Sequence, residues 1–361
     1  MAKALEKQHL TERGGGGVRH VTIGEDEAGV RLDKFLAKQF PQVPRSRLFR
    51  VVRKGEVRVN GGRAQVDQRL ELGDDVRLPP IRATAPETTT DADAGGVRTP
   101  AAPVARVPRT LVQAITDAII QEDERLIVIN KPAGIAVHGG SGVSFGVIEA
   151  LRAARPDERD SLELVHRLDR DTSGVLLVAR KPAVLRMLHA ELRDGDAFDK
   201  RYLTLLRGSW QLGKKRIDAP LRTDLRVGGE RTVKVAASGK SAASDFAPVE
   251  FYGKLATLMQ VTILTGRTHQ IRVHAVHAGH AVAGDEKYGD AEFNQQMRKL
   301  GLNRMFLHAA SLSFVWPDRG TEFSASAPLP QELKQVIDAV STAASLQRRA
   351  TRRRPRSTAG R

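Results

Sequence analysis

An aspartate between two arginines is the part of this sequence best suited to chemistry. Asp169 lies in the stretch HRLDRDTSG, with Arg167 before it and Arg170 directly after it. Neighbouring cations favour the ionised carboxylate, so we expect Asp169 to be an anion at neutral pH. Such an oxygen can attack an electrophilic carbon or remove a proton. From these residues alone, a loop aspartate is more often a structural or solvated acid, so both interpretations stay open.

Two strands are expected to hold this loop. Residues 162–165 have the pattern of one strand and residues 175–179 that of a second, while residues 171–174 have the composition of a turn. Upstream, the apolar stretch ERLIVIN runs into Lys131, Pro132 and a glycine-rich loop. The spacing of a phosphate-binding loop does not occur in that loop, so a nucleotide site is not expected there.

Composition limits the class of protein. A chain of 361 residues with 40% hydrophobic residues is long enough for two domains with packed cores. The sequence has no cysteine, which excludes disulfides, thiolate zinc sites and a cysteine nucleophile, and which fits a reducing cytoplasm. No apolar run has the length of a membrane helix or the form of a secretory signal. We therefore expect a soluble, cytoplasmic protein with no membrane partner.

The charge of the chain favours a polyanionic partner. Lys and Arg number 58 against 42 Asp and Glu, which gives a formal net charge of +16. Seven arginines lie past residue 346 without any acid, but a charge of nine is left without them. Nucleic acid is therefore the expected partner.

Five segments follow from composition along the chain. Residues 1–18 are expected to be a disordered arm, residues 83–110 a flexible linker rich in Ala, Thr, Pro and Gly, and residues 341–361 a basic disordered tail. Two folded units lie between them, residues 19–82 and residues 111–340.

The smaller unit has the pattern of two helices and a hairpin. In VRLDKFLAKQF, Leu32, Phe35 and Leu36 fall on one helical face, and a second helix follows Pro44. Asn60-Gly61 predicts a tight hairpin turn. The second helix carries many cations on one face, which is typical either of an RNA contact or of a solvated surface.

This unit resembles the S4 RNA-binding domain. The resemblance lies in RLDKFLA, PRSRLFRVVRKGEVRVNG and LGDDVRLPP. It implies a small α/β domain that binds structured RNA. The side chains that it implies as RNA contacts are Arg45, Arg47, Arg50, Arg53, Lys54 and Arg58.

The larger unit resembles the pseudouridine synthases of the RluA family. The stretches VHRLDRDTSGVLLVAR, NKPAGIAVHGG, KRYLTLLRG, ILTGRTHQIRVH, AVAGDEKYG and FLHAASLSF occur in the family's order across most of residues 125–316. The resemblance implies an α+β fold with a mixed, largely antiparallel sheet, and isomerisation of uridine to pseudouridine in RNA. That reaction detaches the base at N1 and rejoins it through C5 with nothing added or lost, so no cofactor or metal is expected.

Three catalytic side chains are implied by the same resemblance. Asp169 acts on the sugar, either by attacking C1′ or by removing a proton at C2′. Tyr202 stacks on the target base, positioned for proton removal at C5, although core packing is the simpler interpretation of a lone tyrosine. Arg272 pairs with the catalytic carboxylate, and its guanidinium fork can hold both oxygens of that acid.

Two further side chains are implied as substrate contacts. Because a uridine reacts only outside a helix, a side chain must fill the gap that it leaves, and the resemblance assigns this to Arg167. Pairing of Arg167 with Asp171 is the structural alternative. Leu307 is expected to pack against the base site.

Four histidines close together in sequence raise the possibility of a metal site. His269, His274, His277 and His280 have spacings that scatter their rings around a helix, and no HExxH motif occurs. We therefore expect structural or RNA-facing roles for them and no metal.

The expected function is site-specific conversion of uridine to pseudouridine in large-subunit ribosomal RNA, with no obligate protein partner. A pseudouridine synthase for another RNA, such as tRNA, is an alternative. A non-catalytic RNA-binding factor of ribosome assembly is another, but binding alone needs none of Asp169, Tyr202 and Arg272 at their spacing.

Overall fold

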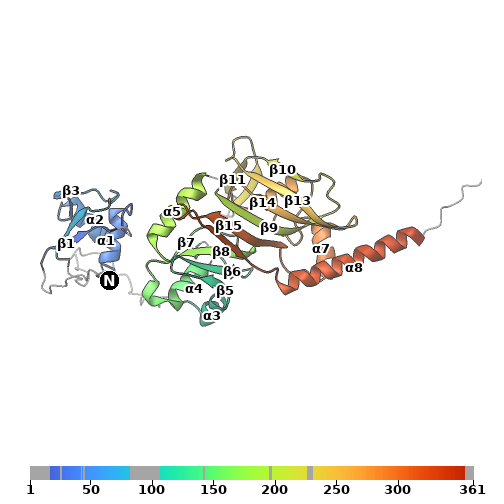
Figure 1. The fold of residues 1–361 in the computed structure, drawn as a ribbon, viewed down its shortest axis with the longest axis horizontal. Helices are drawn as coiled ribbons and strands as arrows, with labels where there is room; N and C mark the ends of the chain where they lie inside the picture. The colour runs from blue at the N-terminus through green and yellow to red at the C-terminus, as the bar shows by residue number, and fades with distance from the viewer. Residues whose placement is uncertain are drawn as a thin grey trace, which may run out of the picture. The chain divides into compact units, whose positions relative to one another are not determined.

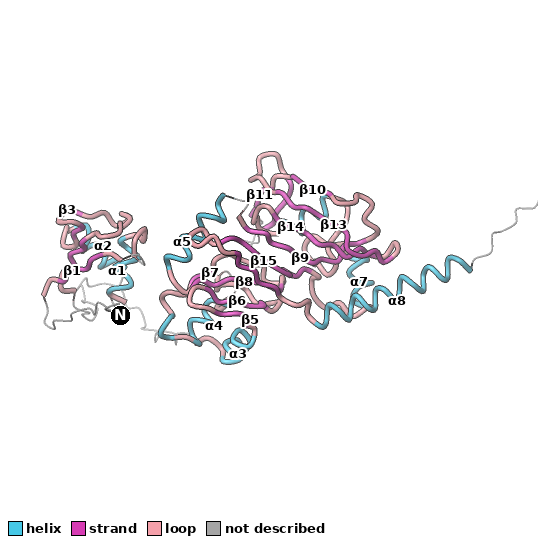
Figure 2. The backbone as a smooth tube through the Cα atoms, viewed as in Figure 1, coloured by secondary structure: helices cyan, strands magenta, loops and turns pink. Residues whose placement is uncertain are grey.

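The computed structural model describes residues 17–24, 27–41, 43, 45–81, 106–140, 143–194, 197–225 and 231–353. The chain divides into two compact units, Met1–Ala102 and Pro103–Arg361. Figures 1 and 2 show the elements of each unit. The expected arm at residues 1–18 and linker at residues 83–110 lie mostly outside the described residues.

The smaller unit is a four-stranded sheet with two helices. The strands follow the order β1-β4-β2-β3, and all neighbours are antiparallel. Its elements are β1 (Arg19–Thr22), α1 (Leu32–Gln39), α2 (Arg45–Arg53), β2 (Arg58–Val59), β3 (Gly62–Arg63) and β4 (Asp75–Leu78).

The predicted elements of this unit are confirmed. Leu32, Phe35 and Leu36 are the buried residues of α1, and they pack in one core with the apolar side of α2. Asn60 and Gly61 connect β2 to β3 with φ values of 51° and 76°. Both residues of this tight turn need a positive φ, which Asn and Gly adopt most readily.

The larger unit is built on a ten-stranded sheet. Its main path is β10-β13-β14-β9-β15-β8-β6-β5, while β16 pairs with β15 and β7 with β8. Among the described strands, β8 and β15 form the parallel pair and the other neighbours are antiparallel, so the expected mixed, largely antiparallel sheet is confirmed. The strands are β5 (Ile119–Glu122), β6 (Leu126–Lys131), β7 (Glu163–Leu164), β8 (Ser173–Ala179), β9 (Phe198–Arg207), β10 (Lys215–Asp218), β13 (Ala243–Tyr252), β14 (Ala256–Ile263), β15 (Leu307–Val315) and β16 (Glu322–Ser326).

Helices and a separate hairpin complete the larger unit. Strand β8 is buried along its whole length. Leu176 and Val178 face one core, which includes helix α4, whereas Val175 and Leu177 face a second core with helix α5. The remaining elements are α3 (Arg109–Asp117), α4 (Val147–Ala154), a short 3-10 turn (Pro156–Glu158), α5 (Pro182–Asp194), β11 (Leu221–Leu225), β12 (Arg231–Val235), α6 (Gln270–His277), α7 (Ala291–Lys299) and α8 (Gln331–Arg353).

The expectation of an unstructured tail from residue 341 onward is wrong as far as Arg353, because α8 continues through this segment. The apolar side chains of the helix recur every three or four residues, and they are buried against α7 and the sheet. These are Leu333, Val336, Val340 and Ala344. Residues 354–361 lie outside the described residues. No helix within the described ranges is long and apolar enough to cross a membrane.

Candidate active site

The five side chains expected to act in catalysis or substrate contact line one pocket of about 70 Å³. They come from four places in the fold: the loop between β7 and β8, strand β9, helix α6 and the first residue of β15. The five are Arg167, Asp169, Tyr202, Arg272 and Leu307. Residues scattered over 140 positions of sequence therefore converge on a single cavity.

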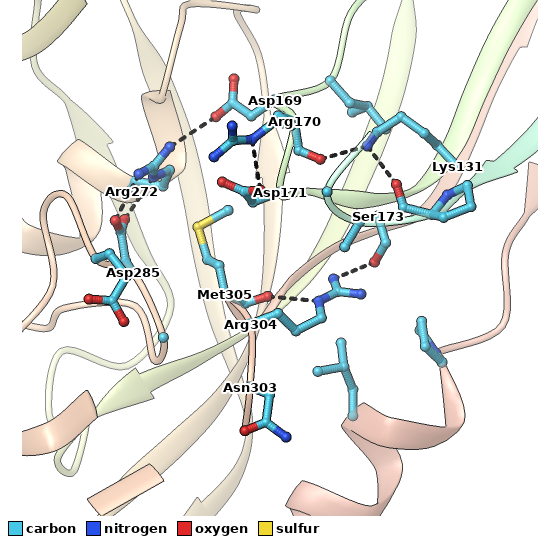
Figure 3. A pocket seen from close by; sticks show the side chains of 18 of the residues that line it. Lys131, Asp169, Arg170, Asp171, Ser173, Arg272, Asp285, Asn303, Arg304 and Met305 are labelled. Carbon is cyan, nitrogen blue, oxygen red and sulfur yellow. Dashed lines mark hydrogen bonds and ion pairs between the residues drawn. The ribbon is translucent and has the colours of Figure 1, made fainter. Parts of the chain in front are cut away.

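Arg272 lies between two carboxylates (Figure 3). Its Nη1 is 3.5 Å from Oδ2 of Asp169. Its Nε and Nη2 both donate to Asp285, each at 2.7 Å, in a bidentate pair. The guanidinium fork therefore holds both oxygens of Asp285 and reaches Asp169 with one nitrogen only, which corrects the expectation that the fork holds Asp169. Sequence analysis did not identify Asp285, although this residue lies in AVAGDEKYG, one of the stretches that resemble the family.

Asp285 is a buried carboxylate that stays ionised. Its residue is 2% exposed, and its carboxylate also accepts hydrogen bonds from the backbone N–H groups of Lys287 and Tyr288. Burial alone would raise the pKa of Asp285, but the hydrogen bonds and the positive charge of Arg272 outweigh it and bring the pKa below its ordinary value. Burial likewise opposes the charge on Arg272, and Asp285 more than compensates, which raises the pKa of the guanidinium.

His269 is the second neighbour of Asp169. Its Nε2 lies 3.9 Å from Oδ2 of Asp169, and its Nδ1 is 2.8 Å from the hydroxyl of Tyr288. Burial is the main cause that lowers the pKa of His269, so the ring is neutral at neutral pH. The backbone at His269 has a φ of 54°, which is uncommon for a residue other than glycine and marks a strained position at the start of α6.

Tyr202 presents a neutral ring and hydroxyl to the pocket. The residue is 7% exposed on the central strand β9, and it lies in register opposite Ala309 of β15 and Val261 of β14. Burial raises the pKa of Tyr202, and the negative charge of Asp169 raises it further. The hydroxyl therefore keeps its proton until a reaction partner takes it.

The two arginines beside Asp169 in sequence differ in their surroundings. Arg170 pairs with Asp171 at 3.2 Å, so Asp171 has a different partner from Arg167. Arg167 is exposed and lines both the small pocket and a larger groove of about 1330 Å³. The guanidinium within hydrogen-bonding distance of Asp169 belongs to Arg272, which is 103 positions away in sequence.

The larger groove opens at the same carboxylate. Asp169, His269 and Arg272 line both cavities. Other cations on the groove's walls include Arg298 and Arg304. A pocket sized for a small ring thus opens into a wide channel with basic side chains, which fits one base taken out of a polyanionic chain.

Lys131 is a functional candidate that the sequence did not single out. The residue is fully buried, and its Nζ donates to the backbone carbonyls of Pro132, Ile135 and Arg170 at 2.8, 2.8 and 3.0 Å. Figure 3 shows the amine directed at the loop that carries Asp169. The feature of the sequence that could have indicated this residue is a lysine at the end of an apolar strand, directly before Pro132.

The expected RNA contacts of the smaller unit lie on α2 and the residues after it. Arg50, Arg53 and Lys54 are exposed, whereas Arg47 is half-buried. Arg58 is exposed on β2 and donates to the carbonyl of Gly61 at 3.1 Å. Arg45 is the first residue of α2, and its side chain is outside the description.

The histidines after residue 268 make separate contacts. His274 is buried between the hydroxyl of Ser244 and the carbonyl of Ala219, at 3.0 Å from each. His280 contacts the carbonyl of Arg207 at 2.8 Å. Across the described residues, no group of three or more His, Asp or Glu side chains is arranged to hold a metal ion.

Known proteins share both units. The profile of the RNA pseudouridylate synthase family matches residues 125–277, and that of the S4 domain matches residues 30–76. The chain is 49% identical to ribosomal large subunit pseudouridine synthase C of Yersinia pestis, over 89% of this chain and 95% of that protein. It is 48% identical to the protein of the same name from Escherichia coli K12, over 89% of this chain and 96% of the other.

A solved structure shares the fold of the catalytic unit. Human RNA pseudouridylate synthase domain containing 4 superposes with a TM-score of 0.53 at 23% identity, covering 64% of this chain and 95% of the human chain. Sequence, domain order and fold agree. The chain therefore belongs to the RNA pseudouridylate synthases of the RluA type, with an S4 domain ahead of the catalytic domain, and is an RNA pseudouridine synthase.

Proposed function

We propose that this enzyme isomerises a defined uridine in large-subunit ribosomal RNA, and that Asp169 is the carboxylate on which the reaction depends. One observation carries the proposal: Asp169 lies where the small pocket meets the basic groove, beside Arg272 and with Tyr202 and Leu307 on the pocket wall. The names of the relatives, ribosomal large subunit pseudouridine synthase C, support the choice of RNA.

The reaction can be followed through the proposed roles. The uracil ring enters the pocket between Tyr202 and Leu307, and Arg167 fills the space that the base leaves in the RNA. Asp169 acts on the ribose, by attack on C1′ or by removal of the C2′ proton, as the N1–C1′ bond breaks. The base turns inside the pocket and bonds to C1′ through C5, while the bond between Asp169 and C1′ breaks or, on the other route, Asp169 returns its proton to C2′. The C5 proton is then removed and N1 gains a proton in its place. Because the Tyr202 hydroxyl is protonated, it takes part by passing on its own proton as it accepts the one from C5.

Docking and location belong to the same proposal. Arg45, Arg47, Arg50, Arg53, Lys54 and Arg58 bind phosphates of the ribosomal RNA. Such contacts position the enzyme without reading sequence directly. The lack of cysteine favours a reducing compartment, and the cytoplasm is the proposed place of action.

The test compares Asp169→Asn with the wild type. The amide keeps the shape of the side chain and loses the anionic oxygen, so conversion should fall below about a thousandth while RNA affinity stays within a few-fold. Asp245→Asn is the matched control, because Asp245 is half-buried on β13 and pairs with Arg216. Turnover of the Asp169→Asn enzyme near the wild-type level would remove Asp169 from the mechanism.

The substrate is tested in cells that lack the protein. Mapping of pseudouridines should show the loss of one or more sites in large-subunit ribosomal RNA, restored by the wild type and not by Asp169→Asn. Loss confined to tRNA would instead identify the alternative substrate.

A further inference from the structure

One short loop contacts both neighbours of the catalytic carboxylate. Residues 284–289, between α6 and α7, include Asp285, which holds Arg272, and Tyr288, which contacts His269. Arg272 and His269 both approach the same oxygen of Asp169, Oδ2, at 3.5 and 3.9 Å. The loop thus contacts both residues that approach Asp169, Arg272 of α6 and His269 directly before this helix.

The backbone of this loop is tightly fixed. Asn294, which is 3% exposed on α7, donates to the carbonyl of Asp285 at 3.0 Å and accepts from the N–H of Gly284 at 2.8 Å. A Cβ at Gly284 would meet the carbonyl oxygen of Arg304 at 2.2 Å, and one at Gly289 would meet that of Asp285 at 1.9 Å. Such close backbone approaches leave Asp285 little freedom to move.

Asp285 sets which nitrogens of Arg272 are left for Asp169. The bidentate pair takes Nε and Nη2, and the ring of Tyr288 lies 4.9 Å from the guanidinium carbon. Without Asp285, the fork could turn its paired nitrogens to both oxygens of Asp169. A carboxylate held on both oxygens is a poorer nucleophile and base, so the pairing with Asp285 keeps Asp169 reactive.

Tyr288 determines which ring nitrogen of His269 carries the proton. The Tyr288 hydroxyl accepts a hydrogen bond from the N–H of Val233 at 2.9 Å, so its own proton is available for Nδ1 of His269. The neutral imidazole then carries its proton on Nε2, on the side of Asp169.

We propose that Asp285 and Tyr288 are positioning residues for the isomerisation: they fix Arg272 and His269 against Oδ2 of Asp169 and so leave Oδ1 to the ribose. The proposal rests on the role of Asp169 proposed above. It differs from a purely structural ion pair in its effect, because loss of a structural pair lowers the melting temperature, whereas loss of a positioning contact lowers the rate of conversion in a folded enzyme.

The experiment is a pair of double-mutant cycles on the full-length chain, with single-turnover conversion, RNA dissociation constant and melting temperature measured for each variant. The first cycle combines Asp285→Asn with Arg272→Met, and the second combines Tyr288→Phe with His269→Ala. Tyr288→Phe keeps the ring beside Arg272 and removes only the hydroxyl. Asp245→Asn is the matched control, since Asp245 forms a bidentate pair with Arg216 at 2.7 and 2.7 Å on the surface.

A positioning role predicts a loss of rate without a loss of binding. Asp285→Asn should lower the single-turnover rate roughly 10- to 100-fold, since small misplacements of reacting groups have effects of this size, while the dissociation constant stays within about 3-fold. Tyr288→Phe should lower the rate several-fold in a folded protein whose melting temperature falls only modestly, because the N–H of Val233 loses its acceptor. Asp245→Asn should leave the rate unchanged.

Non-additivity separates positioning from folding. In the Arg272→Met background, Asp285→Asn should change the rate by less than about 3-fold, because its effect passes through Arg272. The double variant removes both charges of the buried pair, whereas either single variant leaves one buried charge without its partner, so the melting temperature shows which of the variants are folded. The Tyr288→Phe cycle creates no unpaired charge and tests the inference independently.

Two results would overturn the inference. The first is that Asp285→Asn lowers the rate as much in the Arg272→Met background as in the wild type. The second is that Asp285→Asn and Tyr288→Phe each convert RNA at the wild-type rate. If Asp169→Asn itself is active, the proposed site fails; if Asp169→Asn is inactive and Asp285→Asn behaves like Asp245→Asn, the positioning role alone fails.

Discussion

The side chain of Lys131 holds the backbone carbonyl of Arg170, with 3.0 Å between Nζ and the oxygen. Asp169 is the residue directly before Arg170, so the end of β6 is tied to the loop that carries the carboxylate. Two further carbonyls, those of Pro132 and Ile135, complete the set of acceptors around the amine. Three acceptors match the three N–H groups of an ammonium, which makes this contact sensitive to the charge on the lysine.

Lys131→Met should change how stability depends on pH. Burial, with the charge of Arg304 added, lowers the pKa of Lys131 from 10.5 to about 7. Between these values the unfolded chain binds more protons than the folded protein, so Lys131's contribution to the free energy of unfolding rises with pH, by up to about 1.4 kcal/mol per unit. Urea denaturation should therefore show the difference between wild type and Lys131→Met increasing from pH 7 to pH 9. A difference that does not vary with pH contradicts the prediction.

Tyr202→Phe should separate binding from product formation. The ring is kept and only the hydroxyl is lost, so RNA affinity should stay within about 2-fold. The base should leave its original linkage, but loss of the C5 proton should slow, which release of tritium from RNA labelled at C5 of uridine measures. Tyr252→Phe serves as the control, because Tyr252 is also buried and its hydroxyl contacts Glu250 instead. Normal tritium release by Tyr202→Phe would place the base elsewhere.

Replacing Arg50, Arg53 and Lys54 by Ala should weaken RNA binding and flatten its salt dependence. All three are exposed on or after α2. For each phosphate that the variant no longer binds, the slope of log affinity against log salt should fall by about 0.7 to 0.9. The identity of the modified uridine should not change. The control removes the same charge at the exposed Lys214, Lys215 and Lys254 of the catalytic unit. Equal slopes for the two triple variants would show a general charge effect with no special role for α2.

Gly174→Ala should destabilise the catalytic unit more than Gly213→Ala. Both glycines have positive φ, 111° and 60°. A Cβ at Gly174 would meet the carbonyl oxygen of Ala309 at 2.1 Å, whereas one at Gly213 meets nothing within 4 Å. Gly213→Ala should therefore cost about 1 to 2 kcal/mol, and Gly174→Ala above about 3 kcal/mol. Chemical denaturation measures both, and equal costs would mean that β8 and β15 can separate without penalty.

Local patterns predicted the elements that hold the site. The helix at Leu32, the hairpin at Asn60-Gly61 and the strands around Asp169 follow from hydrophobic period and turn residues, which act over a few positions. The resemblance to the RluA family added the identity of the five pocket residues. The continuation of helix α8 past residue 340 was missed because Ala344 lies in a segment rich in small and basic residues, and its burial depends on packing against distant elements.

The partners within the site could not be predicted from neighbours in sequence. Arg167 and Arg170 are close to Asp169 in sequence, yet Arg170 pairs with Asp171 while Arg272 supplies the contact to Asp169. Asp285 captures the fork of Arg272 because the turn between α6 and α7 brings it there. Which of several charges meet is decided by three-dimensional geometry that periodicity does not encode.

The parallel pairing of β8 with β15 spans two residue pairs, Ser173 with His308 and Gly174 with Ala309. Asp169 belongs to the chain that enters β8, whereas Tyr202 and Leu307 belong to the far side of this junction. In the proposed complex, a uridine held by all three side chains would connect the two sides of this junction. A bound uridine should therefore stabilise the sheet at a junction of two residue pairs, and local unfolding that separates β8 from β15 should abolish activity while the other strand pairs stay intact.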